Sequence, residues 1–179
     1  MRILKAAAFA LTGLALVVLA LSALLPRQVV NTRSVMVAAA PDSILGALRD
    51  LPSWSDWNLL LQGAGSLRIS PPTGTAGRGA AIRWRDARGG ENAILLQEAS
   101  PNGIVTEMRF GNGDPMESGF SVDASRPDSV QLHWYVIEQL DWYPWEKFYG
   151  MVAADMKEEA MRQSLIRLRD RIHGRRRGP

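Results

Sequence analysis

The sequence contains no cysteine among its 179 residues and only two histidines. The absence of cysteine excludes disulfides, a thiol nucleophile and any zinc or iron–sulfur site that needs Cys ligands. The two histidines, His133 and His173, lie 40 residues apart and do not form a His-rich metal motif. The G-x-S-x-G nucleophile elbow and the Walker A lysine are also missing. We therefore expect no metal and no cofactor, and the motifs identify no catalytic residues.

Basic residues are scarce over most of the chain and concentrate at its C-terminal end. Residues 157–179 carry eight Lys or Arg and three Asp or Glu, a net charge of +5. Because the whole chain carries +3, the remainder sums to −2. A nucleic-acid-binding domain usually has a basic face over its fold, so no nucleic-acid partner is expected. The Arg-rich end could contact anionic lipid headgroups, or it could be a solvated tail.

A long apolar run lies near the N-terminus, at residues 6–25. Its 20 uncharged residues are enough to cross a hydrocarbon core of about 30 Å as a helix. A cleaved signal peptide is the alternative, but its apolar region is usually only about 7–15 residues long. Arg2 and Lys5 precede the run and favour a cytoplasmic N-terminus. We predict a single-pass membrane anchor, with the rest of the chain on the non-cytoplasmic side.

The chain after the apolar run has no linker or internal repeat. Alternation of apolar and polar residues predicts a strand over residues 29–37. Pro41 begins a segment with one apolar helical face, which predicts a helix from this residue to about 51. A second short helix is expected over residues 52–61.

Short strands separated by turn residues fill the middle of the chain. Each break contains Gly, Pro, Asn or Asp, the residues that turns require. Because a parallel crossover needs about a dozen residues, strands joined this closely must be antiparallel. The expected strands span residues 66–70, 79–86, 91–99, 103–111, 115–124 and 128–138.

A long helix is predicted from about Tyr143 to His173, with Gly174 ending it. Its apolar stripe consists of Met161, Leu165, Leu168 and Ile172, at spacings of three and four residues. The order of strand, two helices, six strands and long helix is typical of an α+β domain. A curved antiparallel sheet wrapped on one long helix would bury the apolar faces of both.

Alternation along the predicted strands divides the sheet into a polar face and an apolar face. Acid–base catalysis needs a positioned ionisable group, and the apolar face offers only Asp86 and Glu98, at strand ends. This face forms either an ordinary core or a pocket for an apolar ligand. Its residues are Ile82, Trp84, Ile94, Leu96, Ile104, Thr106, Met108, Phe110, Met116, Ser118, Phe120, Val122, Val130, Leu132, Trp134 and Val136.

Several short motifs follow one another in a recognisable order. They are the apolar run, Pro26, Arg33-Ser34-Val35, Ala40-Pro41, Trp54-Ser55-Asp56-Trp57, the glycine-led segment from Gly79 to Trp84, Pro101-Asn102 and Leu132-His133-Trp134. In this combination the chain resembles the SRPBCC, or START-like, superfamily over essentially its whole length. More narrowly, it is similar to membrane-anchored members described as polyketide cyclase/dehydrase-like.

The resemblance implies a helix-grip fold, in which a curved seven-stranded antiparallel sheet surrounds a long C-terminal helix and an apolar cavity. It also implies a domain organisation of anchor (1–26), START-like domain (27–173) and basic tail (174–179). Family members carry lipids, sterols, quinones or polyketides, and a minority catalyse cyclisation or hydrolysis. The superfamily has no shared catalytic signature, so the resemblance implies no catalytic residues and no cofactor.

We therefore expect a membrane-tethered domain that binds an apolar, lipid-like molecule in an internal cavity. One alternative is a cyclase- or hydrolase-type enzyme that uses Glu98 or Asp86. Another is a packed structural or interaction module. The residues expected to line the cavity are Trp84, Met108, Phe110, Phe120, Trp134 and Met151.

An aromatic cluster is expected at the start of the long helix. It would either pack against the Trp54–Trp57 pair or form a membrane-facing or ligand-entry rim. Its members are Trp142, Tyr143, Trp145, Phe148 and Tyr149.

Overall fold

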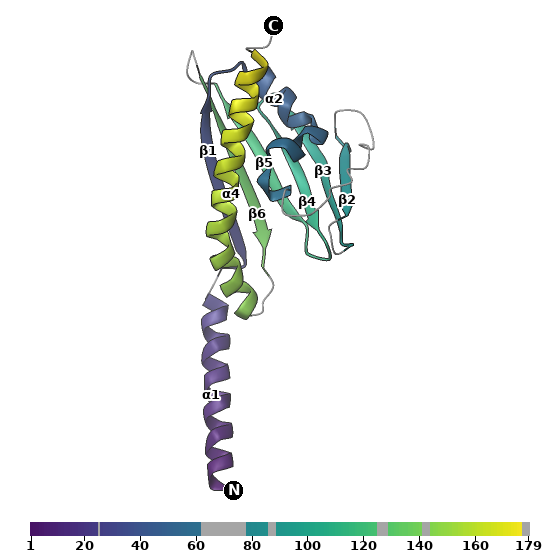
Figure 1. Ribbon diagram of the computed structural model, residues 1–179. Coiled ribbons are helices and arrows are strands. Elements are labelled where there is room, and N and C mark those ends of the chain that lie inside the picture. The colour runs from purple at the N-terminus through teal and green to yellow at the C-terminus, as the bar shows by residue number, and fades with distance from the viewer. Residues whose placement is uncertain (25, 62–77, 86–88, 125–128, 141–143, 177–179) are drawn as a thin grey trace.

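The computed structural model places one helix, α1 (Arg2–Leu24), outside a sheet-and-helix domain (Figure 1). The helix projects from one end of the domain, and the last described residues of the chain lie at the opposite end. The structure describes residues 1–24, 26–61, 78–85, 89–124, 129–140 and 144–176, with the side chains at 4, 144, 146–153, 175 and 176 left out.

A sheet of six described strands forms the domain's main layer, and every neighbouring pair is antiparallel. The strands are β1 (Gln28–Val37), β2 (Ala81–Arg85), β3 (Glu91–Ser100), β4 (Gly103–Phe110), β5 (Met116–Asp123) and β6 (Val130–Gln139). These spans confirm the expected strands to within two residues at each end. The additional strand expected at 66–70 lies outside the described residues.

The strand order is β1-β6-β5-β4-β3-β2. The strands from β2 to β6 form a meander because short turns can join only antiparallel neighbours. The first strand then adds to the last, so that Val30 pairs with Ile137 and Val35 pairs with Leu132. This closing pair brings the start of the domain beside its end.

The predicted helix at Pro41 is confirmed as α2 (Pro41–Arg49), with the proline in its first turn. The expected second helix is instead three short turns: η1 (Leu51–Ser53), α3 (Trp54–Trp57) and η2 (Leu59–Leu61). Asn58 interrupts the helix because its backbone is extended, with φ −83° and ψ 105°. Its side-chain oxygen accepts a hydrogen bond from the Leu60 amide at 3.0 Å, a local bond that competes with helix continuation.

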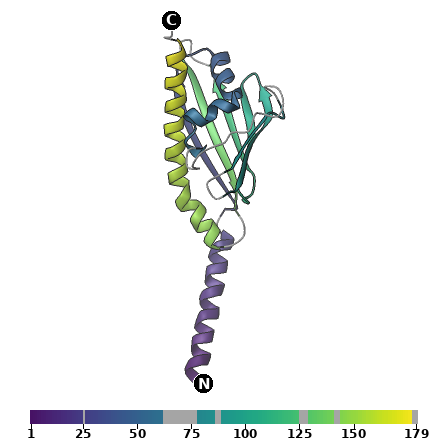
Figure 2. The same ribbon diagram turned by 45° about the vertical axis from the view of Figure 1, so that its right-hand side comes forward.

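The long C-terminal helix, α4 (Pro144–Arg176), lies along β1 on one face of the sheet (Figure 2). Helix α2 and the short turns after it cover the same face beside α4. The four residues of the predicted stripe, from Met161 to Ile172, are all buried. Gly174 does not end the helix, which continues to Arg176, because this glycine lacks the positive φ of a left-handed cap.

Helix α1 is joined closely to the domain. Only three residues separate Leu24 from Gln28, the first residue of β1. The Leu140 amide, just after β6, donates a 2.8 Å hydrogen bond to the carbonyl oxygen of Arg27. The last turns of α1 contact α4, and Ser22 there is only 3% exposed. The segment Lys5–Leu24 is long and apolar enough to cross a membrane, by length and composition.

Candidate ligand-binding site

The predicted apolar face of the sheet is the face covered by α4, α2 and α3. Of the residues expected to line a cavity, Trp84, Met108, Phe120 and Trp134 are buried there. Phe110 is half-buried and packs against the same core. The side chain of Met151 lies outside the described part of the chain. The structure therefore brings five of the six expected residues onto one surface, and their contact with a ligand stays a prediction.

Four aromatic side chains pack together at the centre of this surface. Phe120 and Trp134 are stacked, with ring centroids 5.0 Å apart. Trp57 is in T-shaped contact with both rings, with centroid distances of 6.1 and 6.2 Å, and the centroid of Trp54 lies 5.5 Å from that of Phe120. Trp54 and Trp57 were not among the residues predicted to line the site. Their spacing of three residues could have predicted that they lie together, because it places both side chains on one side of a helical turn.

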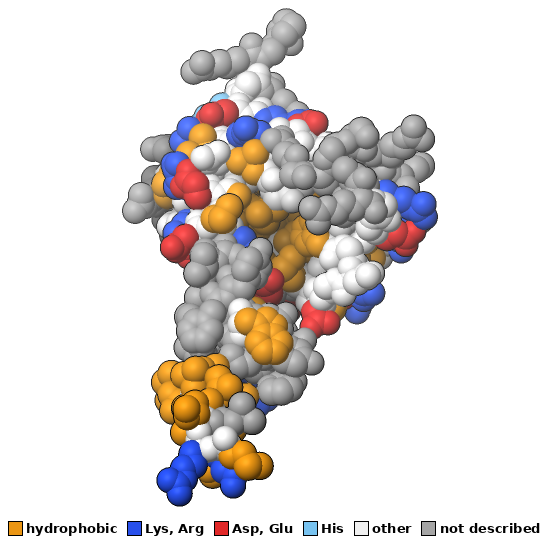
Figure 3. All heavy atoms as spheres, turned by 60° about the horizontal axis from the view of Figure 1, so that its bottom comes forward, with side chains coloured by type: hydrophobic (Ala, Val, Ile, Leu, Met, Phe, Trp, Pro, Cys, Tyr) orange, Lys and Arg blue, Asp and Glu red, His pale blue; other side chains and the backbone are white. Residues whose placement is uncertain are grey.

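A second aromatic pair, Trp84 and Phe110, lies nearer the α1 end of the domain, with centroids 6.0 Å apart. Inner-face residues at this end of their strands, Val29, Phe110 and Met116, are half-buried. Of those farther along the strands, Ile104 and Leu132 are buried, whereas Val35 and Val122 are half-buried. Viewed from the α1 end, the domain shows hydrophobic side chains inside a hollow between the helix and the sheet (Figure 3). Part of the inner surface is thus accessible from the α1 end.

The few polar groups on the inner face are mostly paired with one another. The Trp134 indole nitrogen donates to the Ser118 hydroxyl at 2.8 Å, and the Thr106 hydroxyl donates to the Ser118 carbonyl at 3.1 Å. Trp84 Nε1, Trp57 Nε1 and Asn31 Nδ2 are buried donors that have no hydrogen-bond partner in the part of the chain that the structure describes. A buried donor that lacks a partner is costly, so a ligand oxygen at any of these positions would be stabilising.

Two ion pairs lie between the sheet and α4. Arg33 of β1 pairs with Glu158 of the helix, and Glu138 of β6 pairs with Lys157. All four side chains are partly buried. Glu138 was not predicted as a site residue, although alternation along β6 turns it towards the helix. Arg33, which points inward, was not predicted either, because no faces were assigned to the first strand.

Glu98, a candidate acid for the enzymatic alternative, does not face the interior. The register of β3 against β4 shifts between Leu96 and Glu98, so that Glu98 pairs with the outward-facing Val105. A β-bulge of this kind moves every later side chain to the opposite face. Asp86, the other candidate, lies outside the described residues.

The bulge places Glu98 beside Tyr135 on the outer face, around a pocket of about 240 Å³. Partial burial and a 2.9 Å hydrogen bond to Glu117 raise the pKa of Tyr135 to about 12. The tyrosine is therefore neutral at physiological pH and does not serve as a base there. His133 is half-exposed on this face, as predicted from alternation. Over the described ranges, no group of three or more His, Cys, Asp or Glu could hold a metal ion.

No protein-family model and no curated protein matches the sequence. Among solved structures, a START superfamily protein from Mycobacterium smegmatis is similar, with a TM-score of 0.59 and 20% identity over 81% of this chain and 97% of that one. A protein of unknown function from Staphylococcus aureus has a TM-score of 0.66 and 9% identity, over 84% of this chain and 97% of that one.

Truncated norcoclaurine synthase from Thalictrum flavum is also similar, with a TM-score of 0.54 and 16% identity over 77% of this chain and 91% of that one. These identities are too low to transfer an activity, and what the proteins share is the architecture. The described sheet, with six of the seven strands that the resemblance implies, is wrapped on one long C-terminal helix in the same way. The chain therefore has the helix-grip fold of the START-like, or SRPBCC, superfamily.

Proposed function

We propose that the protein is a membrane-tethered domain that binds one apolar, lipid-like molecule in the hollow between its sheet and α4. The observation that carries this proposal is the inner face of the sheet, which is mainly apolar apart from Arg33 and Glu138, both paired with α4, and which is accessible from the α1 end. A fully packed interaction module would not need an apolar face that opens at one end. The helix-grip fold supports the proposal because a long helix covers this face of the sheet in that fold.

Binding would be driven by desolvation of the ligand. Each Å² of apolar surface removed from water contributes about 25 cal/mol, so a lipid-sized molecule needs few specific contacts. Trp84 and Phe110 would contact the ligand near the opening, and Met108 would lie farther inside. Phe120 and Trp134, which pack on Trp54 and Trp57, would form the closed inner wall. The unpartnered donor of Trp84 would orient a ligand oxygen.

Enzymatic activity of cyclase or hydrolase type is the second candidate. The inward-facing Glu138 favours it, since this carboxylate lies on the inner face beside Lys157. A similar structure is named as a synthase. Under this alternative Glu138→Gln would abolish turnover of a bound substrate while leaving its retention unchanged. If the protein only binds the ligand, the ligand would be chemically unaltered both in the unmodified protein and in the Glu138→Gln variant.

The membrane tether would be α1, with the domain on the non-cytoplasmic side. The length and apolar composition of Lys5–Leu24 support an anchor, and the positive residues Arg2 and Lys5 before it support this orientation. The tether would keep the binding site close to a bilayer, which is the natural source or acceptor of an apolar ligand.

Native mass spectrometry of the full chain, released from detergent micelles, tests ligand binding. We expect one bound apolar molecule per chain in protein purified from its source. Annular lipids on α1 would also be retained, so a matched pair of variants is needed. Met116→Glu places a charge on the inner face at the opening, whereas Met36→Glu places the same charge on the outer face. Both methionines are half-buried.

The ligand should be lost from Met116→Glu and retained by Met36→Glu, with both variants folded by circular dichroism. Equal retention in both variants would show that the molecule is bound elsewhere. A charge at Phe120 would be a poorer test, since this ring is 2% exposed and packs on three tryptophans. That substitution is expected to unfold the domain.

A further inference from the structure

The open end of the hollow and the end of α1 lie at the same end of the domain. Helix α1 meets the domain there through only three residues, and its last turns contact α4. The backbone hydrogen bond between Leu140 and Arg27 joins the end of β6 to the same point. A connection this short, and packed on one side, cannot act as a long flexible tether. If α1 crosses a bilayer, this end of the domain must rest at its surface.

Large apolar side chains are exposed at this end. Trp145, the second residue of α4, is 69% exposed, and Val30, near the start of β1, is 56% exposed. Tryptophan is enriched at the headgroup level of membranes, where its apolar ring and polar N–H are both accommodated. Arg27 lies between α1 and β1, where its charge would meet lipid phosphates. These exposed side chains therefore lie at the same end of the domain as the apolar helix α1.

We propose that the α1 end of the domain is embedded in the headgroup layer of the bilayer that α1 crosses, with Trp145 at the interface. The hollow between α4 and the sheet then opens onto lipid rather than onto bulk water. This inference rests on the proposed function and specifies its partner, a phospholipid bilayer surface. An apolar ligand would pass between the membrane and the binding site without crossing water, which avoids most of the free-energy cost of exposing its apolar surface to water during transfer.

The dimensions agree with this placement. Twenty residues of α1 at about 1.5 Å each span roughly 30 Å, the thickness of the hydrocarbon core. Both ribbon views show α4 rising away from the end of α1 (Figures 1 and 2). Met156 on α4 is 76% exposed, and it lies 11 residues beyond Trp145, or about 16 Å along the helix axis. The headgroup layer is only about 5–8 Å thick on each side, so Met156 would remain in water.

Depth-dependent quenching of a single fluorophore tests the proposal on the full chain. Because the sequence has no cysteine, each introduced cysteine can be labelled alone with an NBD group. The three variants are Gly13→Cys within α1, Trp145→Cys at the expected interface and Met156→Cys as the matched exposed position. Each is reconstituted into phosphatidylcholine vesicles, with or without bromine atoms on the upper part of the acyl chains. A Cβ at Gly13 contacts nothing within 4 Å.

We expect brominated lipid to quench the label at 13 and at 145 and to leave the label at 156 unquenched. Quenching at 13 without quenching at 145 would overturn the docked arrangement while preserving the membrane anchor. Equal quenching at 145 and 156 would also overturn it, since the domain would then lie along the membrane. No quenching at 13 would refute the anchor itself, and with it both the tethered function and this inference.

Discussion

At the scale of single residues, two buried tryptophans differ in how their polar atoms are satisfied. The Trp134 indole donates to the Ser118 hydroxyl, whereas the Trp84 indole has no partner among the residues that the structure describes. Both rings lie on the inner face and both are buried. Of these two residues, Trp84 alone places the cost of an unpaired buried donor on the folded state, and the buried indole of Trp57 in the aromatic cluster does the same. We expect a ligand to accept from Trp84 because its ring lies nearer the opening.

Replacing each tryptophan with phenylalanine should therefore have unequal effects. Both substitutions remove ring volume, but Trp134→Phe also leaves the Ser118 hydroxyl without its donor. We expect Trp134→Phe to lower the free energy of unfolding by about 1–2 kcal/mol more than Trp84→Phe does. Urea unfolding of the ligand-free chain in detergent measures the difference.

The same two substitutions distinguish an effect on the stability of the domain from an effect on ligand binding. Trp84→Phe should weaken retention of a ligand that carries an oxygen, while leaving stability nearly unchanged apart from the lost volume. Similar losses of stability in the two variants would mean that the donor of Trp84 is satisfied in solution.

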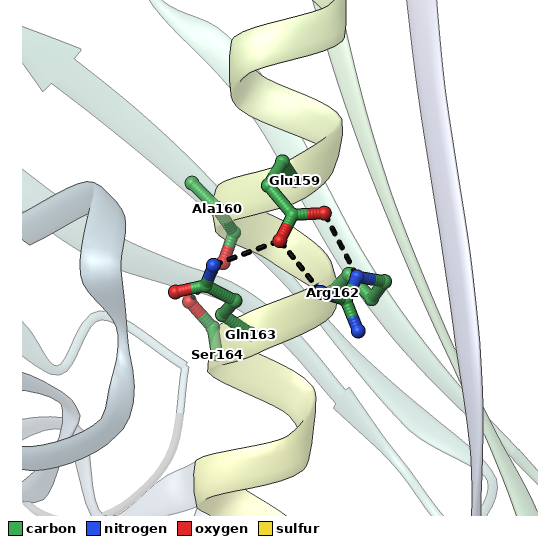
Figure 4. Close-up of polar contacts among 5 residues, drawn as sticks. All are labelled: Glu159, Ala160, Arg162, Gln163 and Ser164. Atoms are coloured by element: carbon green, nitrogen blue, oxygen red, sulfur yellow. Dashed lines mark hydrogen bonds and ion pairs between the residues drawn. The ribbon is translucent and has the colours of Figure 1, made fainter.

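At the scale of elements, α4 combines a buried stripe with a network of charges on its exposed side. The Glu159 carboxylate accepts hydrogen bonds from Arg162 Nε and Nη2, at 2.8 and 2.6 Å, and from Gln163 Nε2 at 2.7 Å (Figure 4). One turn away, the Ser164 hydroxyl donates to the Ala160 carbonyl and accepts from the Leu59 amide of η2. The helix is thus joined to the short turns by a polar contact as well as by its apolar stripe.

The hydrogen bonds from Arg162 and Gln163 lower the pKa of Glu159 to about 2, from its ordinary value of 4.5. The ionised carboxylate is favoured in the folded state, so its contribution to stability is complete above about pH 4.5. That contribution is lost as the pH falls from 4.5 to 2. Carbon-detected NMR titration of Glu159 should show the low pKa directly, and Arg162→Gln should raise it towards 4.5.

A double-mutant cycle provides the control for this prediction. Glu159→Gln should reduce the dependence of the melting temperature on pH between 4.5 and 2. In the Arg162→Gln background it should have a much smaller effect, because the main interaction is already absent. An unchanged pKa of Glu159 in Arg162→Gln would contradict the assigned cause.

At the scale of the whole molecule, the two charged ends of the chain lie at opposite ends of the structure. Arg2 and Lys5 begin α1, whereas the Arg-rich end of α4 lies beyond the far side of the domain (Figure 1). The predicted contact of this Arg-rich end with anionic lipid stays a prediction. In this arrangement, such a lipid surface would not belong to the bilayer that α1 crosses.

The orientation of the domain can be tested by accessibility of introduced cysteines. Gly174→Cys lies near the end of α4, where a Cβ meets nothing within 4 Å, and Arg2→Cys lies before the apolar segment. In intact cells, a membrane-impermeant maleimide should label position 174 and not position 2, with position 2 labelled after permeabilisation. The reverse pattern would place the domain in the cytoplasm, and labelling of both positions in intact cells would contradict a spanning helix.

Much of the fold was predictable from local pattern. Period-two alternation identified the six described strands and their buried face, and the spacing from Met161 to Ile172 identified the buried stripe of α4. Turn residues set the strand boundaries because they impose backbone angles locally. Five expected site residues lie together for the same reason, since each occupies the inner side of its own strand. The short turns after α2 were harder to predict, because the side chain of Asn58 competes with the helix.

The sequence by itself determined which segments are strands and helices, which face of each is apolar, and that one segment is long enough to cross a bilayer. These properties depend only on residues that are close in the sequence and on the side-chain periodicity of helices and strands. Only the tertiary structure decided that a bulge turns Glu98 outward, that Arg33 and Glu138 pair with α4, and that the hollow opens towards α1. Those outcomes depend on how distant segments pair and pack, because strand register and helix placement are set by contacts that no local pattern contains.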